Sequence, residues 1–68
     1  MNKYKVKVTC GGAVTSEVVK GDHPFEALEN SKLAIQPFEG AVLEKKSVSL
    51  EIYNLENPEE TLTMDYNA

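Results

Sequence analysis

The chain has 68 residues but no arginine, no tryptophan and only one cysteine, Cys10. Arginine is the usual bidentate ligand of phosphate and guanine, and both arginine and tryptophan are enriched at the energetic centres of protein interfaces. One cysteine cannot form a disulfide within the chain, and no group of residues has the spacing of a metal or cofactor site. We therefore expect no metal, no cofactor and a fold held together by packing.

Long apolar runs are also missing. No stretch approaches the roughly 20 residues of a membrane-spanning helix. The first five residues are polar and lead directly into a strand-like pattern, unlike a targeting segment. We expect the protein to be cytoplasmic and not to bind a membrane.

The length predicts a single domain, residues 1–68, with a thin core. A chain of this size buries only roughly 60% of its unfolded surface, so a deep substrate cleft is not expected. The net charge is -4, from 11 acidic residues and 7 lysines. Residues 1–20 hold four of the lysines, whereas residues 47–68 hold five acids and no base, so one end of the sequence is basic and the other acidic.

The first twenty residues predict a β-hairpin. Tyr4, Val6, Val8 and Cys10 alternate with polar residues, and a second strand-like run follows Gly11-Gly12. A loop of odd length, for example 11–13, would place Val6 opposite Val18 and Lys7 opposite Glu17. We expect that register because it makes one face apolar and gives the other a cross-strand ion pair.

A single helix is predicted next. Pro24 suits the first helical position, and His23 before it is expected to cap the helix. A helical period places one apolar side along the helix while Leu33 points away from it. The residues of that side are Pro24, Ala27, Leu28, Ser31, Ala34 and Ile35. Pro37 is expected to end the helix near Ile35.

The pattern then returns to a period of two. Val48, Leu50 and Ile52 share one face of a third strand, and the run 41–43 is interpreted as its bent beginning. A turn-rich segment, 54–60, precedes a fourth strand in which Leu62, Met64 and Tyr66 alternate with polar residues.

These elements predict an α+β fold of order β-β-α-β-β, with a four-stranded antiparallel or mixed sheet and one helix packed on one face. The other face would be open and polar. It would carry Lys3, Lys5, Lys7, Glu17, Ser47, Ser49, Glu51, Thr61, Thr63 and Asp65. Its lysines come from the first strand and most of its acids from the last two, so we hypothesise that the first strand lies beside the third or fourth.

No residue constellation predicts catalysis. Cys10 has no expected base beside it, since the only histidine, His23, is assigned to a helix cap. Gly11-Gly12 lacks the downstream helix and third glycine of a nucleotide-binding loop. Glu56, Glu59 and Glu60 lack the donor spacing of a calcium loop. We expect no enzyme activity, with neither a catalytic nor a metal-binding residue.

Residues that fit the predicted fold poorly are the candidates for a protein-binding surface. They are Leu33, Phe38, Tyr53 and Leu55, joined by the acidic loop residues Glu56, Glu59 and Glu60. A contiguous exposed cluster of apolar groups on so small a domain indicates an interface. The alternative interpretation is that the apolar members cap the ends of the core and that the acids are a solvated loop.

A nucleic-acid site is the competing interpretation. Lys3, Lys5 and Lys7 could follow a phosphate backbone, with Tyr53 on the same face for stacking. Net acidity opposes this binding. In the mirror hypothesis, the acidic half imitates nucleic acid and blocks a basic groove on a partner.

We expect a non-enzymatic module that binds another protein or associates with itself. Its small size and acidic balance suit a phage or mobile-element protein that inhibits a host complex by surface binding, an analogy of type. The alternative is a protein that binds or mimics nucleic acid.

Overall fold

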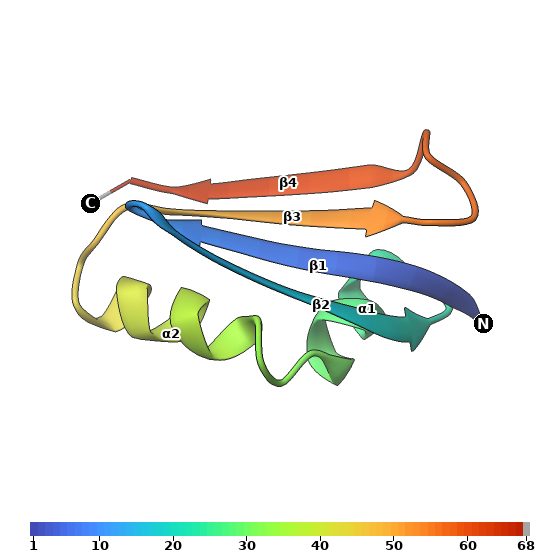
Figure 1. Ribbon diagram of the computed structural model, residues 1–68, viewed down its shortest axis with the longest axis horizontal. Coiled ribbons are helices and arrows are strands. Elements are labelled where there is room, and N and C mark those ends of the chain that lie inside the picture. The colour runs from blue at the N-terminus through green and yellow to red at the C-terminus, as the bar shows by residue number, and fades with distance from the viewer. Residues whose placement is uncertain (68) are drawn as a thin grey trace.

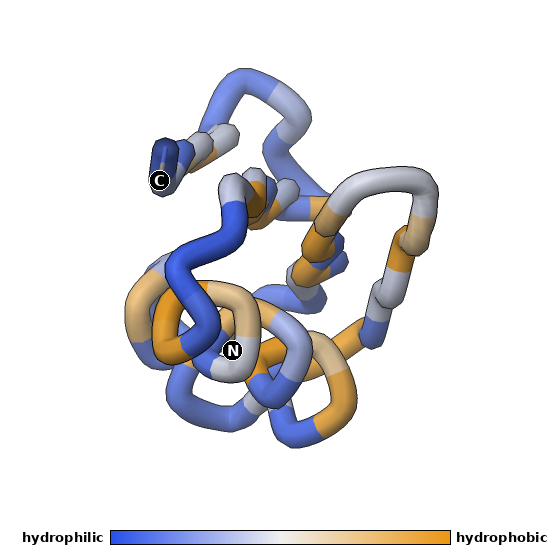
Figure 2. Tube along the Cα trace, turned by 90° about the vertical axis from the view of Figure 1, so that its left-hand side faces the viewer, coloured by the Kyte–Doolittle hydropathy of each residue, from blue (hydrophilic) through white to orange (hydrophobic). Residues whose placement is uncertain are grey.

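The chain forms a four-stranded antiparallel sheet with two helices on one side (Figures 1 and 2). The computed structural model describes residues 1–67, so Ala68 of the expected domain lies outside the described residues. The elements are β1 (Asn2–Cys10), β2 (Ala13–Gly21), α1 (Pro24–Asn30), α2 (Ile35–Leu43), β3 (Val48–Asn54) and β4 (Thr61–Tyr66). The α+β class and the four strands are confirmed, but the order is β-β-α-α-β-β and the single helix was wrong.

The strands lie side by side in the order β2-β1-β3-β4. The hypothesis that the first strand lies beside the third or fourth is therefore confirmed, and its neighbour is the third. Lys7 of β1 is directly opposite Glu51 of β3 on the open face, so this register places a base opposite an acid. The central strands β1 and β3 supply most of the core, and β2 and β4 are the two edges of the sheet.

The register of the first hairpin differs from the predicted one. Gly11 and Gly12 alone form the loop, and Gly11 has a φ of 60°, which favours glycine. Val6 consequently lies opposite Glu17, not Val18, and Lys7 lies opposite Ser16. The expected odd-length loop is wrong.

The physical reason lies in the side chain of Glu17, which belongs to the helix-covered face and not to the open face. Its Oε2 atom accepts hydrogen bonds from the hydroxyl of Ser31 at 3.1 Å and from the backbone N–H groups of Lys32 and Leu33, both at 2.9 Å. An inward carboxylate is tolerated because the connection between α1 and α2 supplies it with donors.

Two short helices replace the predicted long one because the chain leaves the helical conformation after Asn30. His23 is the N-cap of α1, as expected, and its Nδ1 accepts from the N–H of Glu26 at 3.2 Å. Ser31 has an extended backbone, with ψ 130°, and ends the helix. The turn that follows is bonded to Glu17.

Pro37 does not end a helix but lies in the first turn of α2. A proline is tolerated there because the first N–H groups of a helix have no partner inside it. The run 41–43, expected to begin the third strand, is the last turn of α2. A proline was therefore misread as a helix end when it marks a helix start.

The core lies between the sheet and the helices. Alternate residues of β1 and β3 face alanines of the helices, which permit close approach of helix and sheet. The buried apolar residues are Tyr4, Val6, Val8, Ala27, Ala34, Ala41, Val48, Leu50 and Ile52. α1 packs mainly on β2, and α2 packs on β1 and β3, so β4 lies beyond the main cover of both helices (Figure 1).

Neither described helix is long and apolar enough to cross a membrane.

Candidate functional site

The inner face of β4 is the least covered part of the sheet. Leu62, Met64 and Tyr66 point to the side that the helices cover elsewhere, but they are only half-buried. β4 is the strand farthest from the helices (Figure 1), because α2 packs mainly on β1 and β3. Three neighbouring apolar side chains at an edge are a surface that a second polypeptide can cover.

The exposed flank of α2 supplies a second apolar surface on the same side of the sheet. Phe38 and Val42 are one turn apart and pack partly against the core. Leu43, the last residue of the helix, is 84% exposed. Together with Glu39 they line a shallow hollow of about 310 Å³. We refer to this hollow and the inner face of β4 together as the α2–β4 side.

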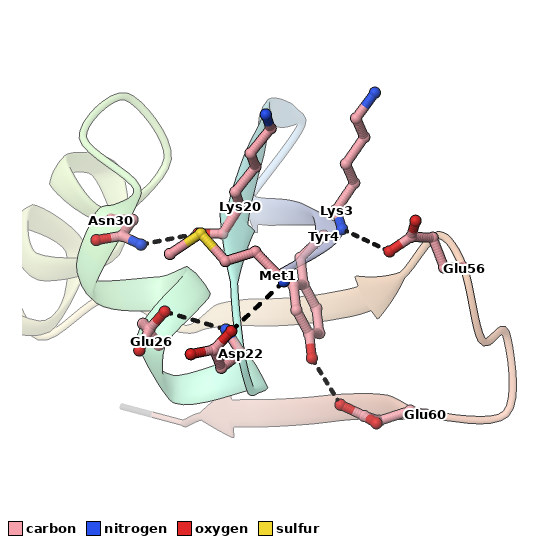
Figure 3. Close-up of polar contacts among 9 residues, drawn as sticks. All are labelled: Met1, Lys3, Tyr4, Lys20, Asp22, Glu26, Asn30, Glu56 and Glu60. Atoms are coloured by element: carbon pink, nitrogen blue, oxygen red, sulfur yellow. Dashed lines mark hydrogen bonds and ion pairs between the residues drawn. The ribbon is translucent and has the colours of Figure 1, made fainter.

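The opposite edge, β2, is protected from pairing. Glu17 is an inward-pointing charge on that strand, and Lys20 adds an outward one. The side-chain amide of Asn30 donates to the backbone carbonyl of Lys20 at 2.8 Å, so α1 blocks part of the backbone of this edge (Figure 3). Inward charges and a covering helix are two common ways of protecting an edge strand. β4 contains no lysine or proline, and its only charge is Asp65.

The loop between β3 and β4 is tied to β1 (Figure 3). The buried hydroxyl of Tyr4 donates to Oε1 of Glu60 at 2.9 Å, and the backbone N–H of Lys3 donates to Glu56 at 3.2 Å. Burial of the ring, followed by the hydrogen bond to Glu60, raises the pKa of Tyr4 above its ordinary value. The acidic residues of this loop therefore have structural partners and are not all free to contact another molecule.

Asn54 shapes the start of the same loop. Its side-chain oxygen accepts from the N–H groups of Glu56 at 2.9 Å and Asn57 at 3.1 Å. The side chain is buried, so these bonds form at the base of the loop, away from its surface. Such a local side-chain to backbone bond is typical of an asparagine turn.

The residues predicted to bind protein fall in four separate places. Leu33 is 65% exposed in the connection between the helices, and Phe38 lies on the α2–β4 side. Tyr53 is on the open sheet face, where its hydroxyl donates to Glu51, a bond that contributes most to raising the pKa of Tyr53. The others, Leu55, Glu56, Glu59 and Glu60, belong to the β3–β4 loop. The structure does not bring the set together in one patch.

Sequence reasoning missed most of the α2–β4 side. Val42 and Leu43 were assigned to a strand, and Leu62, Met64 and Tyr66 were assigned to the core. The four-residue spacing of Phe38 and Val42 was a signal of a helical face that the proline at position 37 obscured.

The open sheet face carries the predicted lysine row. Lys3, Lys5 and Lys7 lie along β1, and Lys20 of β2 joins them directly opposite Lys3. None of the four has an ion-pair partner among residues 1–67. In the described part of the chain, Tyr53, opposite Lys5, is the only aromatic residue placed beside them.

The remaining candidates are dispersed. Cys10 is a half-buried strand residue packed against the core, and His23 caps α1 at an exposed position. Within the described part of the chain, no three histidine, cysteine or acidic residues are grouped so as to hold a metal ion.

No protein-family model matches the chain, and the searches of curated proteins and of solved structures found no significant match either.

Proposed function

We propose that this protein is a binding module without catalytic activity and that its α2–β4 side docks another polypeptide. The observation that carries the proposal is the difference between the two sheet edges. β2 has an inward charge and a covering helix, whereas β4 has an apolar inner face that extends beyond both helices. An edge strand with these features pairs readily with another chain.

The hollow on α2 adds specificity to this edge. A strand that pairs with β4 would contact Leu62 and Met64 on its inner side, and a side chain from the same partner could enter the hollow beside Leu43. Backbone hydrogen bonds along the edge supply affinity, and the apolar pocket selects among side chains. That the protein comes from a phage or mobile element and inhibits a host complex by surface binding stays a prediction.

The test is a pull-down with the tagged protein from a lysate that also contains an untagged copy of the chain. We expect a stoichiometric protein band that Leu43→Lys removes. Leu33→Lys is the matched control, because Leu33 is exposed in the connection between α1 and α2 but lies outside the α2–β4 side. A band retained by Leu43→Lys and lost with Leu33→Lys would contradict the proposal.

Nucleic-acid binding is the second candidate function. The observation in its favour is the addition of Lys20 to the lysine row, since Lys3 and Lys20 are like charges at directly opposite positions. An anionic ligand would relieve their repulsion. The acids of the second half are not arranged as a row: Glu56 and Glu60 are tied to β1, and Glu51 is on the open face. That arrangement gives less support to nucleic-acid mimicry.

A further inference from the structure

We infer that the polypeptide docked at the α2–β4 side is a second copy of this chain, joined through antiparallel pairing of the two β4 strands into one eight-stranded sheet. The inference rests on the proposed function and names the partner of that site. It starts from the number of free edges. With β2 protected and β4 unprotected, pairing of β4 with β2 of another copy is disfavoured, and pairing of β4 with β4 closes after two copies.

The sequence of β4 is compatible with its own antiparallel image. A two-fold axis through Thr63 keeps inner residues opposite inner residues, because directly opposite residues in an antiparallel pair share a face. Leu62 of one copy then lies opposite Met64 of the other, and Thr61 lies opposite Asp65. The inner contacts are apolar and the outer contacts are polar.

The charge of Asp65 selects this axis over the neighbouring one. A two-fold axis through Met64 would also match the faces, but it would make Asp65 of each copy a diagonal neighbour of its counterpart, about 7–8 Å away. The axis through Thr63 places the two carboxylates four residues apart along the strands. It therefore avoids the only like-charge approach that β4 permits.

The ends of the paired strands are also complementary in charge. In this register, the acidic loop that precedes β4 of one copy reaches the end of the sheet where Lys45 precedes β3 of the other, whereas Lys46 next to it is ion-paired with Glu44 of its own copy. Glu59 is exposed in that loop, and Lys45 is exposed in that turn. Opposite charges at both ends favour the antiparallel alignment and help fix its register.

The same pairing would cover the apolar groups that the helices leave open. Leu62 and Met64 of both copies would form one continuous inner strip beyond the two α2 helices. Each copy would gain an apolar neighbour on β4 that its own fold does not provide. Because a chain of 68 residues has a thin core, packing shared between two copies would stabilise the folded state of each.

The first measurement is the molar mass of the purified chain by light scattering after gel filtration, over a range of concentrations. We expect the mass to rise from 7.5 kDa towards twice that value as concentration increases. Met64→Lys adds an inward charge to the edge strand and is expected to remain at the monomer mass, with circular dichroism as the check of folding. A mass of 7.5 kDa at all concentrations overturns the inference.

The second measurement tests the register at Thr63, which is exposed. In a Cys10→Ser background, Thr63→Cys places two cysteines opposite each other at a Cα separation of about 4.5–5.5 Å, within the range that a disulfide requires. We expect a disulfide-linked dimer under mild oxidation. The matched control, Thr61→Cys, is expected to stay monomeric because its neighbour in the other copy is Asp65. Efficient linkage of Thr61→Cys but not of Thr63→Cys overturns the inference.

The two proposals fail in different ways. A wild-type chain that is monomeric, but that loses another captured protein on Leu43→Lys, overturns the dimer and leaves the docking function standing. A dimer that forms equally well in Met64→Lys and does not link through Thr63→Cys overturns both, because it places the contact elsewhere.

Discussion

Glu17 accepts a hydrogen bond at 2.9 Å from the backbone N–H of Leu33, a residue sixteen positions later in the chain. The same carboxylate oxygen accepts from Lys32 and Ser31. One side chain of β2 therefore determines both the register of the first hairpin and the place where the helical region is interrupted. It also gives the β2 edge the inward charge that β4 lacks.

The bonds to Glu17 predict an acid-sensitive stability. The backbone N–H of Leu33 is the largest cause that lowers the pKa of this carboxyl below its ordinary value of 4.5. Because the folded pKa is lowered, the stabilisation is fully present above pH 4.5 and is lost as the pH falls through the folded pKa. We expect Glu17→Gln to unfold at lower denaturant concentration than wild type at neutral pH and to lose less stability on acidification.

The control for this change is Glu29→Gln. Glu29 is exposed on α1 and has no hydrogen-bond or ion-pair partner among residues 1–67. Urea unfolding of the three proteins between neutral pH and about pH 3 is the measurement, since unpaired surface changes are usually within about 0.5 kcal/mol. If the unfolding free energies of Glu17→Gln and wild type depended equally on pH, the stabilising role of the Glu17 carboxylate would be contradicted.

The register of the hairpin predicts opposite outcomes at two adjacent valines. Val18 is 58% exposed on the open face, whereas Val19 packs against the core. Val18→Thr should change the free energy of unfolding by no more than about 0.5 kcal/mol. Val19→Thr buries a hydroxyl and should cost about 1–2 kcal/mol. Chemical denaturation of both variants is the measurement. A larger loss of unfolding free energy in Val18→Thr than in Val19→Thr would favour the register with an odd-length loop.

Close packing of β2 against α1 predicts that Gly21 cannot be replaced without cost. A Cβ atom at this position would lie 2.9 Å from the backbone nitrogen of Ala27, closer than real contacts allow. Gly21→Ala should therefore lower the free energy of unfolding by about 1–3 kcal/mol. At Gly12, where an added Cβ meets no atom within 4 Å, the same change is the control and should be far milder. Thermal unfolding of the two variants is the measurement. A larger loss of stability in Gly12→Ala than in Gly21→Ala would contradict this packing.

An exposed apolar residue outside the α2–β4 side should be dispensable for folding. Leu33→Lys is expected to change the free energy of unfolding by less than about 0.5 kcal/mol, because the side chain is largely in water already. Circular dichroism and urea unfolding are the measurements. Loss of the folded circular dichroism signal would show that Leu33 is part of the core.

Much of the fold follows from local patterns in the sequence. The alternation in β1, β3 and β4, the cap at His23 and the loop before Thr61 are all visible as spacing and turn residues. Charge predicted β1 beside β3 or β4, because lysines and acids are segregated in the sequence, and the structure places it beside β3. These features depend on interactions between residues close in the sequence or on the segregation of opposite charges along it.

The errors come from interactions between distant residues. Glu17 appears in the sequence as a solvent-facing residue, and only the N–H groups beyond α1 make its inward position favourable. The residues around Pro37 are equally compatible with a helix end and with a helix start. The division into two helices therefore depends on the bonds between Glu17 and the segment after α1. The uncovered state of β4 depends on where the helices lie over the sheet, which no local pattern states.

The most direct test of the account is site-specific photo-cross-linking from position 43. A photoreactive phenylalanine analogue in place of Leu43, which is 84% exposed, should leave the fold unchanged while lying in the proposed contact. We predict a covalent adduct with a polypeptide, a second copy of the chain or another protein, and no adduct from the same group at position 14 on the open face, where Val14 is also exposed. An adduct from position 14 and none from position 43 would contradict the assignment of the α2–β4 side as the docking surface.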